Sequence, residues 1–124
     1  MGAIHEGHLS LLKKSIKEND VTICSIYVNP TQFNDKKDLE NYPRTELSDI
    51  AKIKKLQCDV LFMPSDKEMF PQNNCRTQYT FTTCLNKLEG EKRPGHFTGV
   101  ITIVHKLFNI VQPHRAYFGE KDYQ

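Results

Sequence analysis

Stretches with helical and strand-like hydrophobic patterns alternate along the chain, and this alternation constrains the fold more than any other feature. Leu9, Leu12 and Ile16 recur at helical spacing up to about Asn19. The run at 21–28 (VTICSIYV) is rich in β-branched residues and ends at an Asn-Pro pair, which is typical of a buried strand. The alternation predicts an α/β fold, a Rossmann-like parallel sheet flanked by helices.

The alternation continues through the rest of the sequence. We expect a polar loop at 31–44, a helix capped by Thr45, a buried strand at 60–63, an edge strand at 79–83, a glycine-rich loop at 89–99, a helix at 100–111 and a strand-like run at 115–118. The first of these helices should carry one apolar stripe, made of Leu47, Ile50, Ile53 and Leu56. The second should carry Val100, Val104, Leu107, Phe108 and Val111 on one face.

Length and charge exclude several classes of protein. A chain of 124 residues is at most one domain, and a net charge of +2 does not favour nucleic acid or membrane partners. No run approaches the roughly 20 apolar residues of a membrane span, and His5, Glu6 and His8 interrupt any secretory signal. The four cysteines form no C-x-x-C pair, which favours reduced thiols in a cytoplasmic protein over a zinc site.

The segment His5-Glu6-Gly7-His8 stands where a helix begins. A helix N-terminus offers free N–H groups and partial positive charge, and imidazoles add further donors. Gly7 leaves room for a ligand to approach the backbone. The motif therefore predicts a phosphate site, with an ordinary exposed helix start as the alternative.

Other polar groups follow predicted strands, where ligands collect in parallel sheets. Asn29 and Gln32 offer amides to a small polar substrate, or serve only as turn residues. The run 119–122 (GEKD) offers a lysine to phosphate and carboxylates to Mg²⁺ or ribose, or is a charged turn. Three residues of the glycine-rich loop line a cleft or only stabilise the loop: Glu89, Arg93 and His96.

Several segments together resemble one enzyme family. The opening MGAIHEGH resembles the nucleotide motif of the pantothenate synthetase (pantoate–β-alanine ligase) family, in the HxGH nucleotidyltransferase group. Further matches follow in family order: SIYVNPTQF at 25–33, YPRT at 42–45, LEG at 88–90, RPGHF at 93–97, KLFNIV at 106–111 and YFGEKD at 117–122. The resemblance spans essentially the whole chain.

The resemblance implies ATP-dependent joining of pantoate to β-alanine through a pantoyl-adenylate, with release of pyrophosphate and AMP. It also implies a Mg²⁺ cofactor and a cytoplasmic homodimer, but no particular metal ligand. The implied catalytic residues are His5, His8 and Lys121, and the implied substrate residues are Asn29, Gln32 and Gln124. The implied ATP-binding residues are Met1, Gly2, Ala3, Ile4, His5, Glu6, Gly7, His8, Gly119, Glu120, Lys121 and Asp122.

Members of that family have a further strand before position 1 and continue past position 124 into a small C-terminal domain. We therefore expect residues 1–124 to be a partial nucleotide- and pantoate-binding domain, poorly active alone. Two alternatives stay open. One is another HxGH nucleotidyltransferase, which has no need of the substrate amides. The other is a non-catalytic nucleotide- or metal-binding module using His5, His8 and His96.

Overall fold

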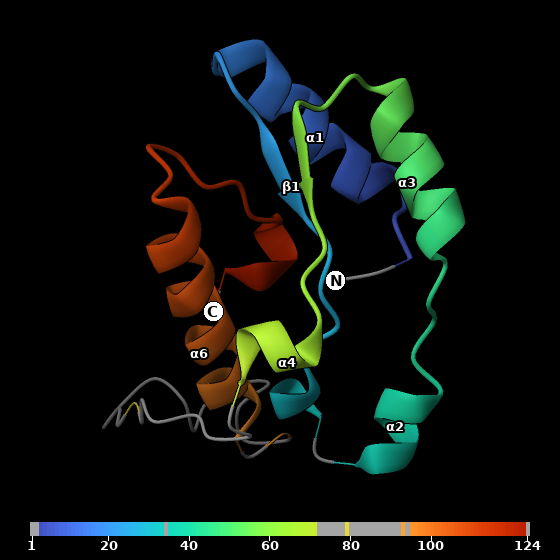
Figure 1. Cartoon of the computed structure of the whole chain (residues 1–124), viewed down its shortest axis with the longest axis vertical. Coiled ribbons are helices and arrows are strands. Elements are labelled where there is room, and N and C mark those ends of the chain that lie inside the picture. Colours follow the sequence, from blue (N-terminus) through green and yellow to red (C-terminus); the bar gives the residue numbers. More distant parts are fainter. Residues whose placement is uncertain (1–2, 34, 72–78, 80–92, 94, 124) are drawn as a thin grey trace. The chain divides into compact units, whose positions relative to one another are not determined.

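Two strands from separate parts of the sequence pair in parallel in the computed structural model of the chain (Figure 1). They are β1 (Ile23–Ser25) and β2 (Val60–Phe62), and the register sets Cys24 opposite Leu61. The predicted α/β class with a parallel sheet is confirmed. The strand expected at 21–28 is reduced to the three residues of β1.

The structure describes residues 3–33, 35–71, 79, 93 and 95–123. It divides into two compact units, the first made of residues 1–28, 43–64 and 115–124 and the second of residues 29–42 and 65–114. Besides the strands, the first unit contains α1 (Glu6–Glu18), α3 (Glu46–Lys55) and the 3-10 turn η2 (Glu120–Asp122). The second contains the 3-10 turn η1 (Pro30–Gln32), α2 (Lys36–Glu40), α4 (Asp66–Met69) and α6 (His96–Val111).

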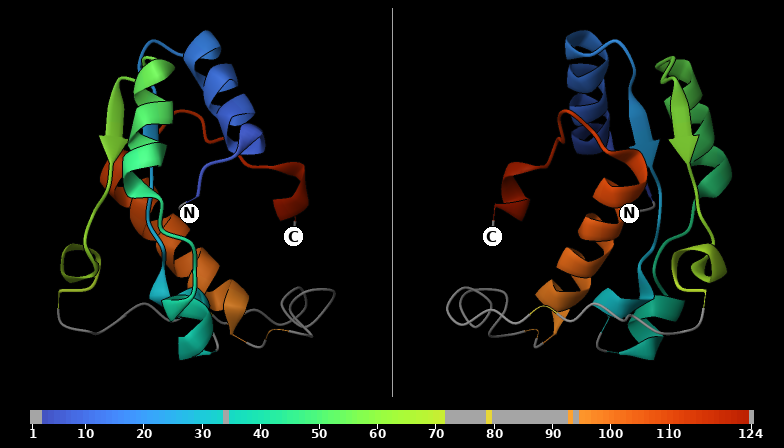
Figure 2. Two further views of the ribbon diagram at one scale, coloured as in Figure 1. Left: turned by 90° about the vertical axis from the view of Figure 1, so that its right-hand side faces the viewer. Right: turned by 60° about the vertical axis from the view of Figure 1, so that its left-hand side comes forward.

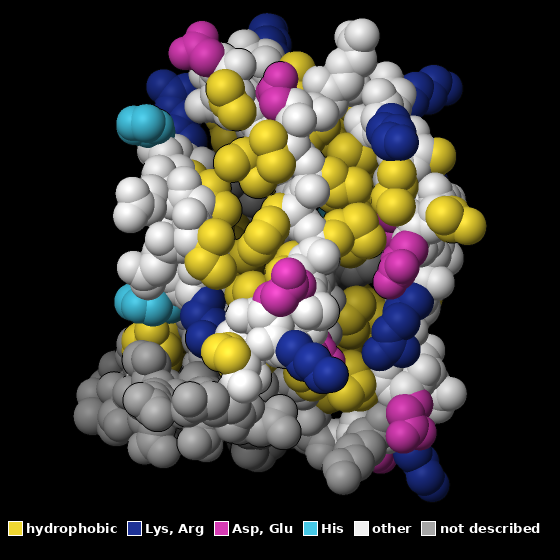
Figure 3. All heavy atoms as spheres, in the orientation of Figure 1, with side chains coloured by type: hydrophobic (Ala, Val, Ile, Leu, Met, Phe, Trp, Pro, Cys, Tyr) yellow, Lys and Arg dark blue, Asp and Glu magenta, His cyan; other side chains and the backbone are white. Residues whose placement is uncertain are grey.

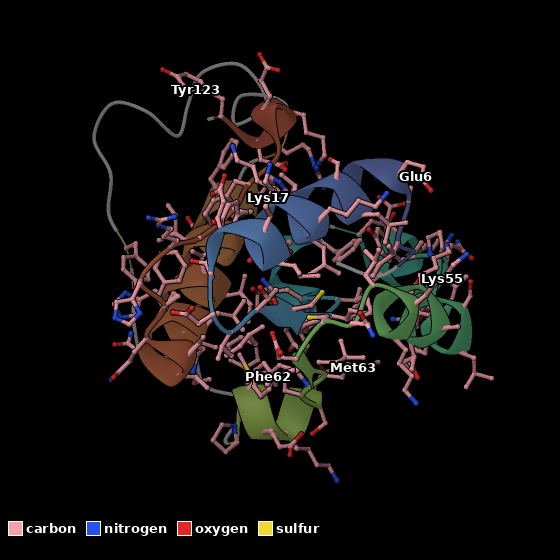
Figure 4. All side chains as sticks on the ribbon, turned by 90° about the horizontal axis from the view of Figure 1, so that it is seen from above. Glu6, Lys17, Lys55, Phe62, Met63 and Tyr123 are labelled. Atoms are coloured by element: carbon pink, nitrogen blue, oxygen red, sulfur yellow. The ribbon has the colours of Figure 1, made fainter. Side chains whose placement is uncertain are left out.

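The core of the first unit lies between the two helices and one face of the strands. Figure 2 shows α1 and α3 beside the strand pair. Alternate strand residues face opposite ways, and Figure 4 shows Phe62 and Met63 on opposite sides of the chain. The buried core residues are Ile4, Leu12, Ile26 and Ile53, with Leu9, Ile16, Cys24, Leu56, Cys58, Leu61 and Met63 packed against them.

Apolar side chains of the first unit also remain at its surface. Val21, Ile23 and Val60 are exposed in and beside the strands. Figure 3 shows hydrophobic side chains gathered on the face of the molecule over β1 and β2. One face of the strand pair thus supplies the core, while residues of the alternate set stay accessible.

The second unit is organised around α6. Its buried residues are Gly99, Thr102 and Ile103, and Met69 and Phe70 at the end of α4 are buried as well. Phe108, on the apolar face predicted for this helix, is 43% exposed. The helix also begins earlier than predicted, because the last four residues of the expected loop at 89–99 form its first turn.

Other expectations also need correction. The stretch at 31–44, predicted as a loop, overlaps η1 and contains α2, and α4 is an additional helix. The run 115–118 forms no strand, although all of its residues are described. Leu47 is 86% exposed and does not belong to the buried stripe of α3. The edge strand expected at 79–83 lies, except for Tyr79, outside the described residues.

Candidate active site

The histidine motif forms the N-terminal cap of α1. The Gly7 N–H donates to His5 Nδ1 at 3.1 Å, and the His5 N–H donates to His8 Nδ1 at 3.4 Å. The two imidazoles thus make a reciprocal capping box, an arrangement more often built by serine or threonine with glutamate. The predicted helix start is confirmed, one residue after His5.

These two bonds fix the tautomers of both neutral rings. A backbone N–H can only donate, so each Nδ1 must hold a lone pair and each ring hydrogen sits on Nε2. The rings are stacked, with centroids 3.9 Å apart and an angle of 26° between their planes. Both imidazoles therefore offer an N–H donor on the ring atom that the cap does not use.

The charge on His8 is set by its surroundings. Partial burial is the main cause that lowers its pKa from the usual 6.5, and the positive charges of His5 and Lys121 lower it further. The Asp122 carboxylate acts in the opposite direction. His8 is consequently neutral at pH 7 and still donates through Nε2–H.

Lys121 and Asp122 reach this site from η2. The Asp122 N–H donates to Gly119 O at 2.9 Å, and Lys121 Nζ donates to Asp122 Oδ1 at 2.9 Å. Because both side chains are exposed, their ion pair is weak. Lys121 can accordingly exchange this carboxylate for the oxygen of a bound phosphate.

Asp49 on α3 anchors the backbone in front of the histidines, a role that the sequence analysis missed. It is 1% exposed and accepts the Ala3 N–H at 2.9 Å and the Ile4 N–H at 2.8 Å. Thr45 Oγ1 donates to the same carboxylate at 3.1 Å, and Lys52 Nζ donates to Ile4 O at 2.5 Å. The sequence signal for this role is that Asp49 lies one turn before Ile53 on the buried side of α3.

The substrate amides predicted at Asn29 and Gln32 belong to the second unit. Asn29 is 1% exposed, and its Oδ1 accepts the N–H and the hydroxyl of Thr31 at 3.2 and 2.8 Å. Its Nδ2 donates to Gly99 O at 3.0 Å. Asn29 therefore caps η1 and ties it to α6, and a direct contact with substrate stays a prediction. The backbone oxygen of Gln32 lies 3.1 Å from His96 Nδ1.

The structure thus gathers His5, His8, Lys121 and Asp122 in one unit. Glu6 lies at the start of α1 and is exposed (Figure 4). Four predicted or considered residues lie outside the described part: Met1, Gly2, Glu89 and Gln124.

Metal-binding and membrane-spanning features are both missing from the described residues. They contain no cluster of three histidine, cysteine, aspartate or glutamate side chains that could hold a metal ion. Cys24 and Cys58 are free thiols, whereas Cys75 and Cys84 lie outside the described part. No described helix is both long and apolar enough to cross a membrane.

Comparison with known protein families gives a match over the whole chain. The family model described as pantoate-beta-alanine ligase matches residues 1–124. The chain belongs to this family. The motif resemblance found in the sequence is thereby confirmed.

Curated relatives of this pantoate-beta-alanine ligase family member are named pantothenate synthetase. Those of Bacteroides fragilis and Porphyromonas gingivalis are 52% and 48% identical over all 124 residues. These matches cover 44% of each relative, so the chain spans less than half of their length.

Solved structures of family members share the fold. The pantothenate synthetase of Thermus thermophilus matches with a TM-score of 0.92 and 44% identity, over 99% of this chain and 45% of that one. The pantoate-beta-alanine ligase of Francisella tularensis, complexed with beta-gamma ATP and beta-alanine, matches with a TM-score of 0.88 and 49% identity. That alignment covers 91% of this chain and 43% of the other.

Proposed function

We propose that the chain is the nucleotide- and pantoate-binding part of a pantoate–β-alanine ligase. In the first step, a carboxylate oxygen of pantoate attacks the α-phosphorus of ATP, and pyrophosphate leaves. In the second step, the amine of β-alanine attacks the carbonyl carbon of the pantoyl-adenylate, and AMP leaves. The products are pantothenate, AMP and pyrophosphate.

The observation that carries this proposal is the pair of Nε2–H donors at the start of α1, with Lys121 in electrostatic range of His8. Negative charge grows on the phosphoryl oxygens as pyrophosphate leaves, and preorganised donors aimed at that charge are the main catalytic resource. His8 donates a hydrogen bond to this charge through Nε2–H, His5 supports it, and Lys121 holds the ATP phosphates. Residues 1–8 and 119–122 bind the nucleotide.

Gln32, Gln124 and Asn29 are the proposed substrate residues. A glutamine amide can donate to a carboxylate and accept from a hydroxyl, so it suits a hydroxy acid such as pantoate. Within the described residues, no hydrogen bond engages the Gln32 side-chain amide. Among the described residues the amide thus has no competing hydrogen-bond partner, which supports the proposal.

The exposed Asp122 carboxylate beside Lys121 fits a Mg²⁺ ion bound mainly through ATP. Mg²⁺ commonly uses one or two carboxylates together with substrate phosphates rather than a cage of protein ligands. When bound, the ion would supply charge neutralisation at the phosphates. Asp122 would then hold the ion while Lys121 holds a phosphate oxygen.

Isotope exchange between pyrophosphate and ATP tests this function in the protein expressed from the complete coding region. Exchange should require pantoate but not β-alanine, and His8→Ala should reduce it by roughly 100-fold or more. Lys55→Ala, an exposed lysine of α3, is the control and should leave exchange unchanged. Exchange without pantoate would instead indicate another nucleotidyltransferase, and nucleotide binding without exchange a non-catalytic module.

Three expectations belong to the same proposal, one for residues 1–124 alone and two for the complete protein. Since the chain covers 44% of its curated relatives, we expect the 124 residues alone to be poorly active. We expect the complete protein to be a cytoplasmic homodimer. Light scattering of the purified protein tests the dimer, and normal turnover by residues 1–124 would contradict the first expectation.

A further inference from the structure

The turn η1 and the first turn of α6 lie against each other within the second unit. An ideal Cβ on Gly99 would lie 2.4 Å from Thr31 O and 2.7 Å from the Thr31 carbonyl carbon. Such distances are far inside van der Waals contact, so only glycine fits at this position. The two backbones are in direct contact, and a displacement of one must move the other.

Two side chains reinforce this contact, one from each segment. Asn29, just before η1, donates to Gly99 O at 3.0 Å. His96, the first residue of α6, contacts the backbone oxygen of Gln32, the last residue of η1, through Nδ1 at 3.1 Å. The turn is therefore fixed at both of its ends.

The chemistry of the His96 contact assigns its direction. A carbonyl oxygen only accepts, so His96 Nδ1 must carry the hydrogen and donate it to Gln32. This N–H is present in the protonated ring and in one of the two neutral tautomers. The bond selects that tautomer when the ring is neutral.

The bond acts on the backbone of Gln32 and leaves its side-chain amide unengaged. Gln32 is half-buried, and no described residue hydrogen-bonds to its side-chain amide. Fixing the backbone limits the directions in which the amide can point, and this reduces the ordering entropy that ligand binding would otherwise cost.

We propose that His96 is a positioning residue for the hydroxy-acid substrate, because its Nδ1–H holds the Gln32 backbone from which the substrate amide projects. This role rests on the proposed function, in which Gln32 binds pantoate. His96 itself contacts the backbone and not the reacting atoms. Its loss should therefore weaken substrate binding more than it changes nucleotide binding.

Steady-state kinetics of three variants in the protein from the complete coding region test this role. His96→Asn places an amide N–H near the position of Nδ1. Aspartate has nearly the same volume as asparagine, but His96→Asp directs an acceptor at the Gln32 carbonyl oxygen. We expect His96→Asp and His96→Ala to raise the KM for pantoate about tenfold, equivalent to about 1.4 kcal/mol. His96→Asn should stay within about threefold of wild type, and the KM for ATP should change less than twofold. His114→Asp, at an exposed histidine, is the matched control.

The outcomes separate the two proposals. Equal effects of Asn and Asp, a parallel rise in the KM for ATP, or wild-type kinetics in all three variants would overturn the positioning role. A wild-type protein without pantoate-dependent turnover would instead refute the proposed function and this role with it. Thermal unfolding identifies variants that fail to fold, and if His96→Asp is one of them, the Asn and Ala variants are compared by the same criteria.

Discussion

Asp49→Ala should destabilise the chain strongly, because it removes the acceptor that holds the backbone before the histidine motif. The carboxylate is buried and accepts two backbone N–H groups and one hydroxyl. Hydrogen bonds to a charged group contribute roughly 1.5–3 kcal/mol each. The two backbone bonds alone give about 3–6 kcal/mol, and because the Ala3 N–H is only partly buried, we expect a loss of about 3–5 kcal/mol.

Asp49→Asn separates charge from geometry at the same site. One side-chain oxygen remains an acceptor, while the amide nitrogen would face a backbone N–H, so about half of the loss should remain. Denaturant titration gives the free energy of unfolding, and Asp20→Ala, an exposed aspartate, is the control. A loss below about 1 kcal/mol for Asp49→Ala would refute the anchoring role.

Three further predictions concern the pKa of His8, the Gly99 contact and the Cys24 thiol. An NMR titration should give His8 a pKa below 6.5, so its contribution to stability is present above pH 6.5 and is lost as the pH falls through the folded-state pKa. Lys121→Ala should raise the pKa of His8, because the lysine charge lowers it. An unchanged pKa in this variant would contradict the electrostatic role of Lys121. Gly99→Ala should lower the free energy of unfolding by about 1–3 kcal/mol, because the new Cβ would clash with Thr31 O. A gain in stability would contradict this, since it would mean that the higher helix propensity of alanine outweighs the clash. Burial raises the pKa of the Cys24 thiol to about 11, so about one thiol in a thousand is ionised at pH 8. A thiol reagent should therefore label Cys24 slowly until the chain is unfolded. Fast labelling of Cys24 in the folded chain would contradict this prediction.

Hydrophobic periodicity predicted the elements that bury an apolar face. The helix α1 and the strand β2 match their expected positions because their side chains enter one core with Ile53. The same method missed α2 and α4, which are short and polar. Their start signals are local: Asp35 caps α2, and Ser65 with Glu68 forms a capping box at α4.

The site was predictable only where its chemistry is visible in the residue types. His5 and His8 were identified by the motif, but their mutual capping depends on ring orientation, which the sequence does not specify. The anchoring role of Asp49 was not predicted, because the burial of its carboxylate depends on backbone partners 45 and 46 residues away. Asn29 was predicted to contact substrate or to serve as a turn residue, and its bonds to Thr31 confirm the turn role. Its bond to Gly99, 70 residues away, could not be predicted from the sequence.

The capping histidines affect how substitutions in the motif should be interpreted. Alanine at position 5 would remove the acceptor for the Gly7 N–H together with the ring N–H, so its kinetic defect would mix a frayed helix with a lost ligand contact. Asparagine is a good helix cap and is too short to replace the distal ring nitrogen. Comparing the two variants would distinguish the contribution of helix order from that of nucleotide recognition.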